Sequence, residues 1–204
     1  GIDVVSLGEL ITAIKANVSP EDIYFHGNNK SNKEILVALN YGEITFVVDN
    51  IGELKEISET ASKLNKKCNI LLRINVQVQA DTHKYDITAD VDSKFGMLMN
   101  SSELKECLDL LKSDENLNFG GYHAHIGSQI FDIELYYESI NKLMTLVDKE
   151  MVINIGGGFG VNYTKDDKAK SIAFNSKSII DYVEKVIKEK NIKIKSLMIE
   201  PGRS

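Results

Sequence analysis

Short apolar runs alternate along the chain with longer segments in which apolar residues recur every three or four positions. The short runs are typical of buried strands, and the longer spacing is typical of amphipathic helices. The pattern predicts strands at residues 2–5, 22–26, 44–49, 69–75, 121–126, 152–155 and 197–199. Between them it predicts helices at residues 8–16, 33–39, 51–64, 101–111, 133–147 and 176–190. This alternation favours a parallel sheet with right-handed helical crossovers.

Two architectures have this order of elements, the doubly wound open sheet and the (β/α)8 barrel. Polar residues or glycines lie at or near the C-terminal end of nearly every predicted strand, as expected at the face of a barrel that carries its site. They are Asp3, Ser6, His26, Asn28, Asp49, Arg73, Asn75, His125, Ser128, Gly156, Gly157, Gly158, Glu200 and Arg203. We therefore predict an α/β fold, an incomplete TIM-type (β/α)8 barrel with about seven of the eight βα units.

Composition narrows the possible functions. The chain has 204 residues, 43% of them hydrophobic, and a net charge of −6 without a basic stripe, so one globular domain is expected and nucleic acid is not an expected partner. No apolar run is long enough for a membrane span, and the first residues do not resemble a secretory signal. Cys68 and Cys107 lie apart and outside any metal-binding motif, which favours reduced thiols in the cytoplasm.

The segment "VINIGGGFG", residues 152–160, is a predicted buried strand that ends in three glycines. Glycines at a strand end let backbone N–H groups approach an anion closely, which is a common way of binding phosphate. The segment matches neither a dinucleotide fingerprint nor a Walker loop. A phosphate site and a simple tight turn both remain open from these residues alone.

The segment "GGYHAHIGSQIFD" places His123 and His125 two residues apart on a predicted strand, so both should point to one face. A metal site would need a third ligand, and His26 and His83 lie at no recognisable spacing, so no metal is predicted. The two remaining roles are a ring that stacks on a planar cofactor and a histidine in the core. The turn-rich stretch at residues 81–92, which leads into "DSKFG", is interpreted as a functional or a surface loop.

The chain ends with "SLMIEPGRS", where Glu200 follows a predicted strand. A carboxylate there could be a general base, a metal ligand or the partner of a protonated ring nitrogen, and Pro201 and Gly202 would form the turn that directs it. Only Arg73 and Arg203 are arginines among the 24 basic residues. Both lie at strand ends, where a planar guanidinium suits a carboxylate or phosphate.

Several segments occur together in one order: "GIDVVSLGEL", "FHGNNKS", "LLRIN", "THKYDIT", "DSKFG", "HAHIGSQI", "NIGGGFG" and "EPGRS". In this order they resemble the diaminopimelate decarboxylases, pyridoxal-phosphate (PLP) enzymes with an alanine-racemase-like barrel. The resemblance covers essentially the whole chain. It implies PLP as the cofactor and a reaction that removes carbon dioxide from meso-2,6-diaminopimelate, through an aldimine, to give L-lysine.

The resemblance also implies roles for individual residues. The glycine run, with Gly158 closest, would bind the phosphate, supported by Ser128. His125 would stack on the ring, and Glu200 would keep the ring nitrogen protonated; these two are the expected catalytic residues. The substrate carboxylate would be bound by Arg203, and the further cofactor contacts would come from Asp3, Ser6, Arg73, Pro201 and Gly202.

The same resemblance implies that the chain is an internal piece of a longer enzyme. The lysine that binds the cofactor is expected upstream of Gly1, because Lys15 lies at a helix end and not at a strand end. Residues 1–204 would then contain the second to the eighth barrel strand, with the first barrel strand and a C-terminal β-domain expected outside them, and alone they should be inactive. The complete protein is expected to be a cytoplasmic homodimer with shared active sites. Alternatives are a decarboxylase of ornithine, arginine or carboxynorspermidine, and a non-catalytic relative.

Overall fold

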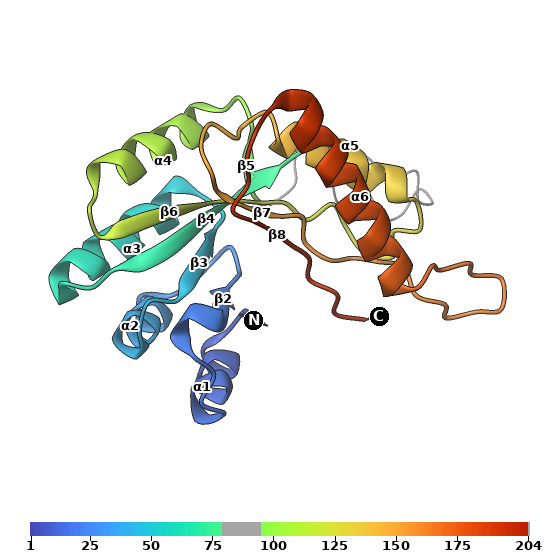
Figure 1. The fold of residues 1–204 in the computed structure, drawn as a ribbon. Helices are drawn as coiled ribbons and strands as arrows, with labels where there is room; N and C mark the ends of the chain where they lie inside the picture. Colours follow the sequence, from blue (N-terminus) through green and yellow to red (C-terminus); the bar gives the residue numbers. More distant parts are fainter. Residues whose placement is uncertain (79–94, 204) are drawn as a thin grey trace. The chain divides into compact units, whose positions relative to one another are not determined.

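The computed structural model describes residues 1–78 and 95–203. The chain forms two compact units, the first made of Gly1–Arg73 and Lys94–Gly121, the second of Ile74–Ser93 and Tyr122–Ser204 (Figure 1). The expected loop at 81–92, His83 and the first three residues of "DSKFG" lie outside the described residues. The described helices include none that is long and apolar enough to cross a membrane.

The strands of the first unit are parallel where their register is defined. The strand β1 (Ile2–Val4) pairs with β2 (Ile23–Phe25), which pairs with β3 (Thr45–Val48), which pairs with β4 (Cys68–Asn75). The next neighbour is β6 (Leu117–His123), and the short strand β5 (Met97–Leu98) pairs with β4. All four residues of β3 are buried, as expected for a strand covered on both faces.

Helices follow the strands of the first unit and pack on one another in chain order. They are α1 (Leu7–Lys15), α2 (Asn32–Tyr41), α3 (Ile51–Leu64) and α4 (Ser102–Ser113), coloured from dark blue to green in Figure 1. Each begins at a polar cap, Ser6, Ser31, Asn50 or Ser101, whose side-chain oxygen accepts a backbone N–H of the first turn. A 3-10 helix at Pro20–Asp22 precedes β2.

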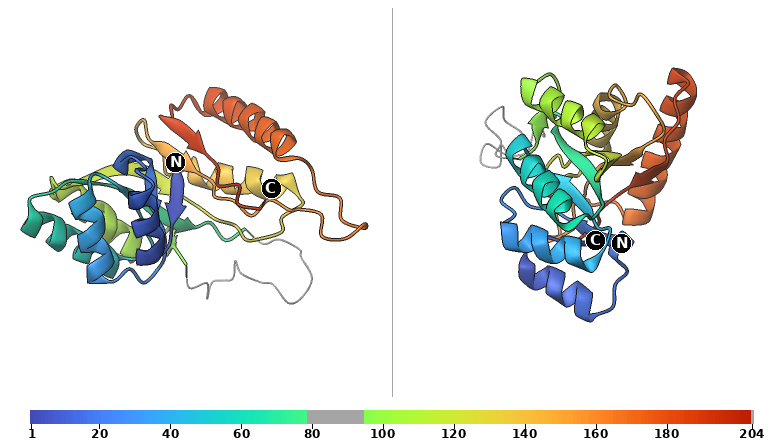
Figure 2. Two further views of the ribbon diagram at one scale, coloured as in Figure 1. Left: turned by 90° about the horizontal axis from the view of Figure 1, so that it is seen from below. Right: turned by 90° about the vertical axis from the view of Figure 1, so that its left-hand side faces the viewer.

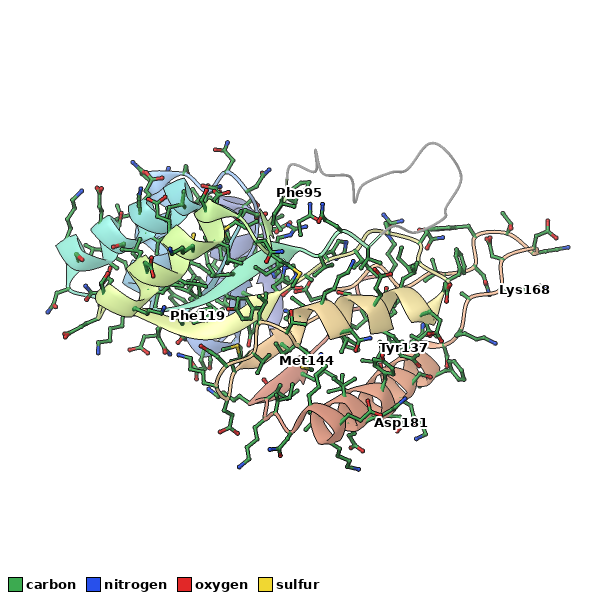
Figure 3. The ribbon with its side chains drawn as sticks, turned by 90° about the horizontal axis from the view of Figure 1, so that it is seen from above. Phe95, Phe119, Tyr137, Met144, Lys168 and Asp181 are labelled. Atoms are coloured by element: carbon green, nitrogen blue, oxygen red, sulfur yellow. The ribbon has the colours of Figure 1, made fainter. Side chains whose placement is uncertain are left out.

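The second unit continues from the end of β6 through β7 (Val152–Asn154) to β8 (Ser196–Met198). The helices α5 (Ile133–Leu143) and α6 (Ile172–Lys190) pack side by side (Figures 1 and 2). Between them the rings of Tyr137 and Tyr182 stack with centroids 4.0 Å apart (Figure 3). Figure 2 shows the loop that joins β7 to α6 extending past these helices.

The order of the strands decides between the two architectures. Neighbouring strands run β1-β2-β3-β4-β6-β7-β8, in chain order throughout the described residues. A doubly wound sheet reverses its order at a switch point, whereas a (β/α)8 barrel adds each strand beside the previous one. The topology is therefore that of a barrel.

The predicted bounds of the strand at 121–126 are wrong, although a strand is present there. The strand predicted there is β6, which begins at Leu117 and ends at His123. Pairing beside β4 extends its start, since Cys68 N donates to Asn116 O, and the left-handed backbone at Gly127 and Gln129 belongs to a turn. His123, the last residue of the strand, is fully buried, whereas His125 lies beyond its end and is exposed.

Candidate active site

The glycine run at the end of β7 has a backbone that only glycine tolerates. Gly156 and Gly158 have φ angles of 71° and 86°. A Cβ atom would lie 2.6 Å from the Ala124 carbonyl oxygen at Gly156, and at Gly158 it would overlap the carbonyl oxygen of Gly127. The segment between β6 and α5 thus lies directly against the glycine run, and side chains are excluded from the contact.

Glu200 lies two residues beyond β8 and is held against the same glycines. Its backbone N donates to Gly156 O at 2.9 Å. Its Oε1 accepts a hydrogen bond of 2.8 Å from Asn154 Nδ2 and lies 3.4 Å from His123 Nε2. Asn154 Oδ1 in turn accepts Gly156 N at 2.9 Å. We call Glu200, Asn154, His123 and Gly156 the Glu200 cluster.

His125 also contacts the glycine run, through a hydrogen bond with Gly157. Its Nδ1 accepts a hydrogen bond of 3.3 Å from Gly157 N, so a neutral imidazole carries its proton on Nε2. Gly157 O accepts the hydroxyl of Tyr136 at 2.9 Å, and burial raises the pKa of Tyr136, which keeps that donor protonated. Ser128 follows in the turn after β6 and is exposed.

Arg203 is exposed and lies at the end of the described chain, beyond the turn formed by Pro201 and Gly202. Its NH1 donates to the hydroxyl of Tyr163 at 2.8 Å. Tyr163 belongs to the loop between β7 and α6, in which Figure 3 labels Lys168. Asp167 fixes this loop, because its Oδ2 accepts the backbone N–H groups of Tyr163 and Thr164 at 2.9 Å and 2.7 Å.

The first unit contains the other three predicted cofactor residues. Asp3 lies on β1, with Oδ1 3.5 Å from His26 Nε2. The Ser6 hydroxyl accepts Glu9 N at 3.3 Å and caps α1, so it has a local structural partner. Arg73 lies on β4, where its guanidinium is 4.7 Å from the ring centre of Phe95, labelled in Figure 3.

Arg73 is also part of a buried set of charges. Its NH1 lies 3.8 Å from Asp49 Oδ1, which accepts Gly96 N at 2.7 Å, and Asp49 N donates to Glu53 Oε2 at 2.9 Å. Glu53 Oε1 is 2.5 Å from Lys30 Nζ. We call Lys30, Glu53, Asp49 and Arg73 the Lys30 cluster.

Lys30 is a buried cation whose donors have three acceptors: Glu53, and the carbonyl oxygens of Gly27 and Val47 at 2.8 Å each. Burial lowers the pKa of Lys30 and raises the pKa of Glu53, and the opposite charge of the partner counters both shifts. The cluster joins the segments that follow β2 and β3.

The structure thus brings His125, Gly156, Gly157, Gly158 and Glu200 together in the second unit, and places Asp3, Ser6 and Arg73 in the first. The sequence-based predictions did not include Asn154 or Tyr163, and of the Lys30 cluster they included Asp49 and Arg73 but not Lys30 and Glu53. A polar residue inside the apolar run "VINI" was a usable signal for Asn154. Nothing in the sequence marked Tyr163, whose contact with Arg203 depends on the path of the loop.

The model of one protein family matches residues 1–204, and its description is pyridoxal-dependent decarboxylase, pyridoxal binding domain. The chain belongs to this family. It is 38% identical to a diaminopimelate decarboxylase of Bacillus methanolicus and 39% identical to that of Halalkalibacterium halodurans, over all of this chain and 49% and 48% of those proteins. The chain thus spans about half the length of the curated relatives it matches.

Solved structures of the family confirm the fold. The diaminopimelate decarboxylase of Methanocaldococcus jannaschii in complex with L-lysine superposes with a TM-score of 0.88 at 36% identity, over 100% of this chain and 48% of that one. The predicted incomplete TIM-type barrel and the predicted resemblance are therefore correct.

Pyridoxal phosphate is the cofactor of this domain, and the residues of the second unit fit it. The glycine run presents backbone without side chains, as a phosphate requires. Glu200 supplies a carboxylate with one oxygen held by Asn154, as a protonated ring nitrogen requires.

Proposed function

We propose that the protein carrying this chain decarboxylates meso-2,6-diaminopimelate to L-lysine with pyridoxal phosphate. The observation that carries the proposal is Glu200, a carboxylate whose Oε1 is held by Asn154 and whose backbone is hydrogen-bonded to the glycine run. The names of the similar proteins support the substrate, as does the lysine bound to the Methanocaldococcus jannaschii enzyme, since lysine is the product of this reaction.

In this proposal the second unit holds both ends of the cofactor. The glycine run, with Gly158 closest and Ser128 in support, binds the phosphate, and His125 presents its ring to the cofactor plane. Glu200 accepts a hydrogen bond from the ring nitrogen and keeps it protonated. When bound, the cofactor supplies a conjugated ring that takes up the electrons of the broken carbon–carbon bond.

The remaining predicted residues have supporting roles. Arg203 binds a carboxylate of the substrate, with Pro201 and Gly202 setting its position, because a guanidinium pairs with both carboxylate oxygens. Asp3, Ser6 and Arg73 contact the edge of the cofactor. The second, distal carboxylate of diaminopimelate would distinguish it from amino acids that have only one carboxylate.

The test is release of carbon dioxide by the purified protein that carries this chain, measured with diaminopimelate, ornithine, arginine and carboxynorspermidine. We expect release from diaminopimelate with L-lysine as the other product. Release only from one of the other three amino acids would contradict the substrate and leave the reaction class intact. No release from any of them would favour a non-catalytic relative.

We further propose that residues 1–204 alone are inactive and that the active protein is a cytoplasmic homodimer whose sites are shared between subunits. The similar decarboxylases are about twice as long as this chain, which supports a site completed by other segments. Sedimentation of the whole protein tests the dimer. Carbon dioxide release by the isolated 204 residues would contradict the first part.

A further inference from the structure

Asn154 is the last residue of β7, is fully buried and uses both ends of its amide. The Nδ2 group donates to Glu200 Oε1 at 2.8 Å, and Oδ1 accepts Gly156 N at 2.9 Å. One side chain therefore links the carboxylate of the Glu200 cluster to the first glycine of the run.

Only a side chain with a donor at one end and an acceptor at the other can make this link. Alanine would leave a buried N–H and a carboxylate oxygen without these partners. Aspartate has the same shape, but it would place a second carboxylate where Glu200 Oε1 now receives a hydrogen bond, and two carboxylates so close cannot both be ionised without strong repulsion.

We propose that Asn154 is a positioning residue that fixes the distance between the phosphate-binding glycines and the carboxylate that meets the ring nitrogen. The inference rests on the roles proposed above for Glu200 and the glycine run. A donor on Oε1 stabilises the ionised carboxylate and directs its other oxygen toward the cofactor, while the bond to Gly156 N fixes the backbone from which the phosphate is bound.

A purely structural Asn154 would predict something different. Loss of a buried hydrogen bond would then lower the stability of the fold and weaken every ligand alike. A positioning residue affects the two ends of the ligand specifically, so affinities must be compared among ligands that differ at one end only.

Three ligands with the same aldehyde make this comparison: pyridoxal phosphate, pyridoxal without the phosphate, and the deaza analogue with carbon in place of the ring nitrogen. Their affinities for the purified protein are measured by absorbance titration. For Asn154→Ala we expect pyridoxal phosphate to bind about tenfold more weakly, the effect of one hydrogen bond to a charged group. The ratio of its affinity to that of each other ligand should also decrease. We expect the larger decrease for the ratio to the deaza analogue.

Asn175→Ala is the matched control. Asn175 is also a buried asparagine of the second unit, but it lies on α6, outside the Glu200 cluster. We expect it to leave the ratios among the three affinities unchanged, whatever it does to the melting temperature.

The isosteric variant Asn154→Asp tests the polarity of the link and remains informative if the alanine variant does not fold. Its affinity for pyridoxal phosphate should fall as pH rises and the two carboxylates both ionise, whereas the affinity of Asn154→Ala should not show this additional fall. In Asn154→Asp/Glu200→Gln the amide donates in the opposite direction. We expect that double variant to regain its melting temperature without regaining the preference for the ring nitrogen.

Two results would overturn the proposal. One is equal weakening of all three ligands by Asn154→Ala, and the other is full recovery of the ring-nitrogen preference in the double variant. These measurements use the cofactor without substrate, so their outcome does not depend on whether diaminopimelate is the substrate. The carbon dioxide assay can contradict the proposed substrate while the role of Asn154 is supported, and the binding measurements can contradict that role while the substrate is supported.

Discussion

The Lys30 cluster and the Glu200 cluster both hold a carboxylate near the end of a strand, and they stabilise it in different ways. Glu53 lies 2.5 Å from a buried ammonium group, so its charge is neutralised within the fold. Glu200 receives an amide hydrogen bond from Asn154 and has an imidazole nitrogen 3.4 Å away. The amide is a neutral donor, so it orients the Glu200 carboxylate without cancelling its charge.

The difference separates a carboxylate that joins segments of the fold from one that is prepared for a ligand. An ion pair with a buried lysine satisfies the charge, and removal of either partner leaves the other charge unpaired. A carboxylate oriented by an amide keeps a negative charge that can attract a cationic group of a ligand. We therefore expect changes at Glu53 to lower stability and changes at Glu200 to lower activity.

The largest effect is expected for Lys30→Met, which leaves Glu53 buried without its cation. Loss of one partner of a buried ion pair typically lowers the free energy of unfolding by about 3–5 kcal/mol. Replacing both partners, in Lys30→Met/Glu53→Met, should recover most of that loss, because hydrophobic replacements of a buried pair are often neutral. Urea denaturation of the three proteins measures both changes.

Lys33→Met is the control for this prediction, since Lys33 is exposed on α2, three residues from Lys30. Its free energy of unfolding should change by about 0.5 kcal/mol or less. If the double variant were as unstable as Lys30→Met, the pair would stabilise the fold by more than the neutralisation of each charge by the other.

Gly158→Ala should have the next largest effect. Gly158 has a φ of 86°, and a Cβ there would overlap the Gly127 carbonyl oxygen. We expect the free energy of unfolding to fall by about 1–3 kcal/mol, and pyridoxal phosphate to bind more weakly. Gly8→Ala on α1, where a Cβ would have its nearest neighbour at 3.9 Å, should instead raise stability by about 0.5–1 kcal/mol.

Glu200→Gln and Glu53→Gln test the comparison directly, because each replaces one carboxylate by an amide of the same shape. Glu200→Gln retains an oxygen that accepts from Asn154, so its free energy of unfolding should change by about 1 kcal/mol or less. Its rate of carbon dioxide release should fall about 10- to 100-fold, the effect of a lost charged hydrogen bond. Glu53→Gln should mainly lower stability; the opposite pattern for the two variants would contradict the distinction.

The sequence predicted elements well where local signals agree. Residues 51–64 were predicted as a helix and form α3, because Asn50 caps it and the buried residues Leu54, Ile57 and Ala61 recur at helical spacing. Boundaries failed where tertiary pairing decides them. The strand predicted to begin at residue 121 begins at Leu117, because β6 pairs alongside β4 over residues whose own pattern is not that of a strand.

The candidate site was predicted less completely than the fold. The glycine run and Glu200 could be found because glycines and a carboxylate at strand ends are typical of a binding site. Asn154 could not be assigned a role from the sequence. It links Gly156, two residues ahead, to Glu200, 46 residues ahead, and only the fold brings Glu200 close. The buried pair of Lys30 and Glu53 was missed for the same reason, since the two residues are 23 positions apart.

The smallest effect is expected at Asp167, a partly exposed carboxylate of the loop that contains Tyr163, the partner of Arg203. The backbone hydrogen bond from Thr164 lowers the pKa of Asp167 below its ordinary value, so the folded state binds fewer protons than the unfolded state. The stabilisation is therefore present above the ordinary pKa of 3.8 and is lost as pH falls through the folded value. The protection of the Tyr163 and Thr164 amides from exchange, relative to the unstructured rate at the same pH, should decrease in that acid range, and Asp167→Asn should remove this pH dependence. Asp166→Asn should leave it unchanged, since the Asp166 side chain accepts no hydrogen bond from the described residues. Exchange that does not respond to Asp167→Asn would show that this carboxylate does not fix the loop that carries Tyr163, the partner of Arg203.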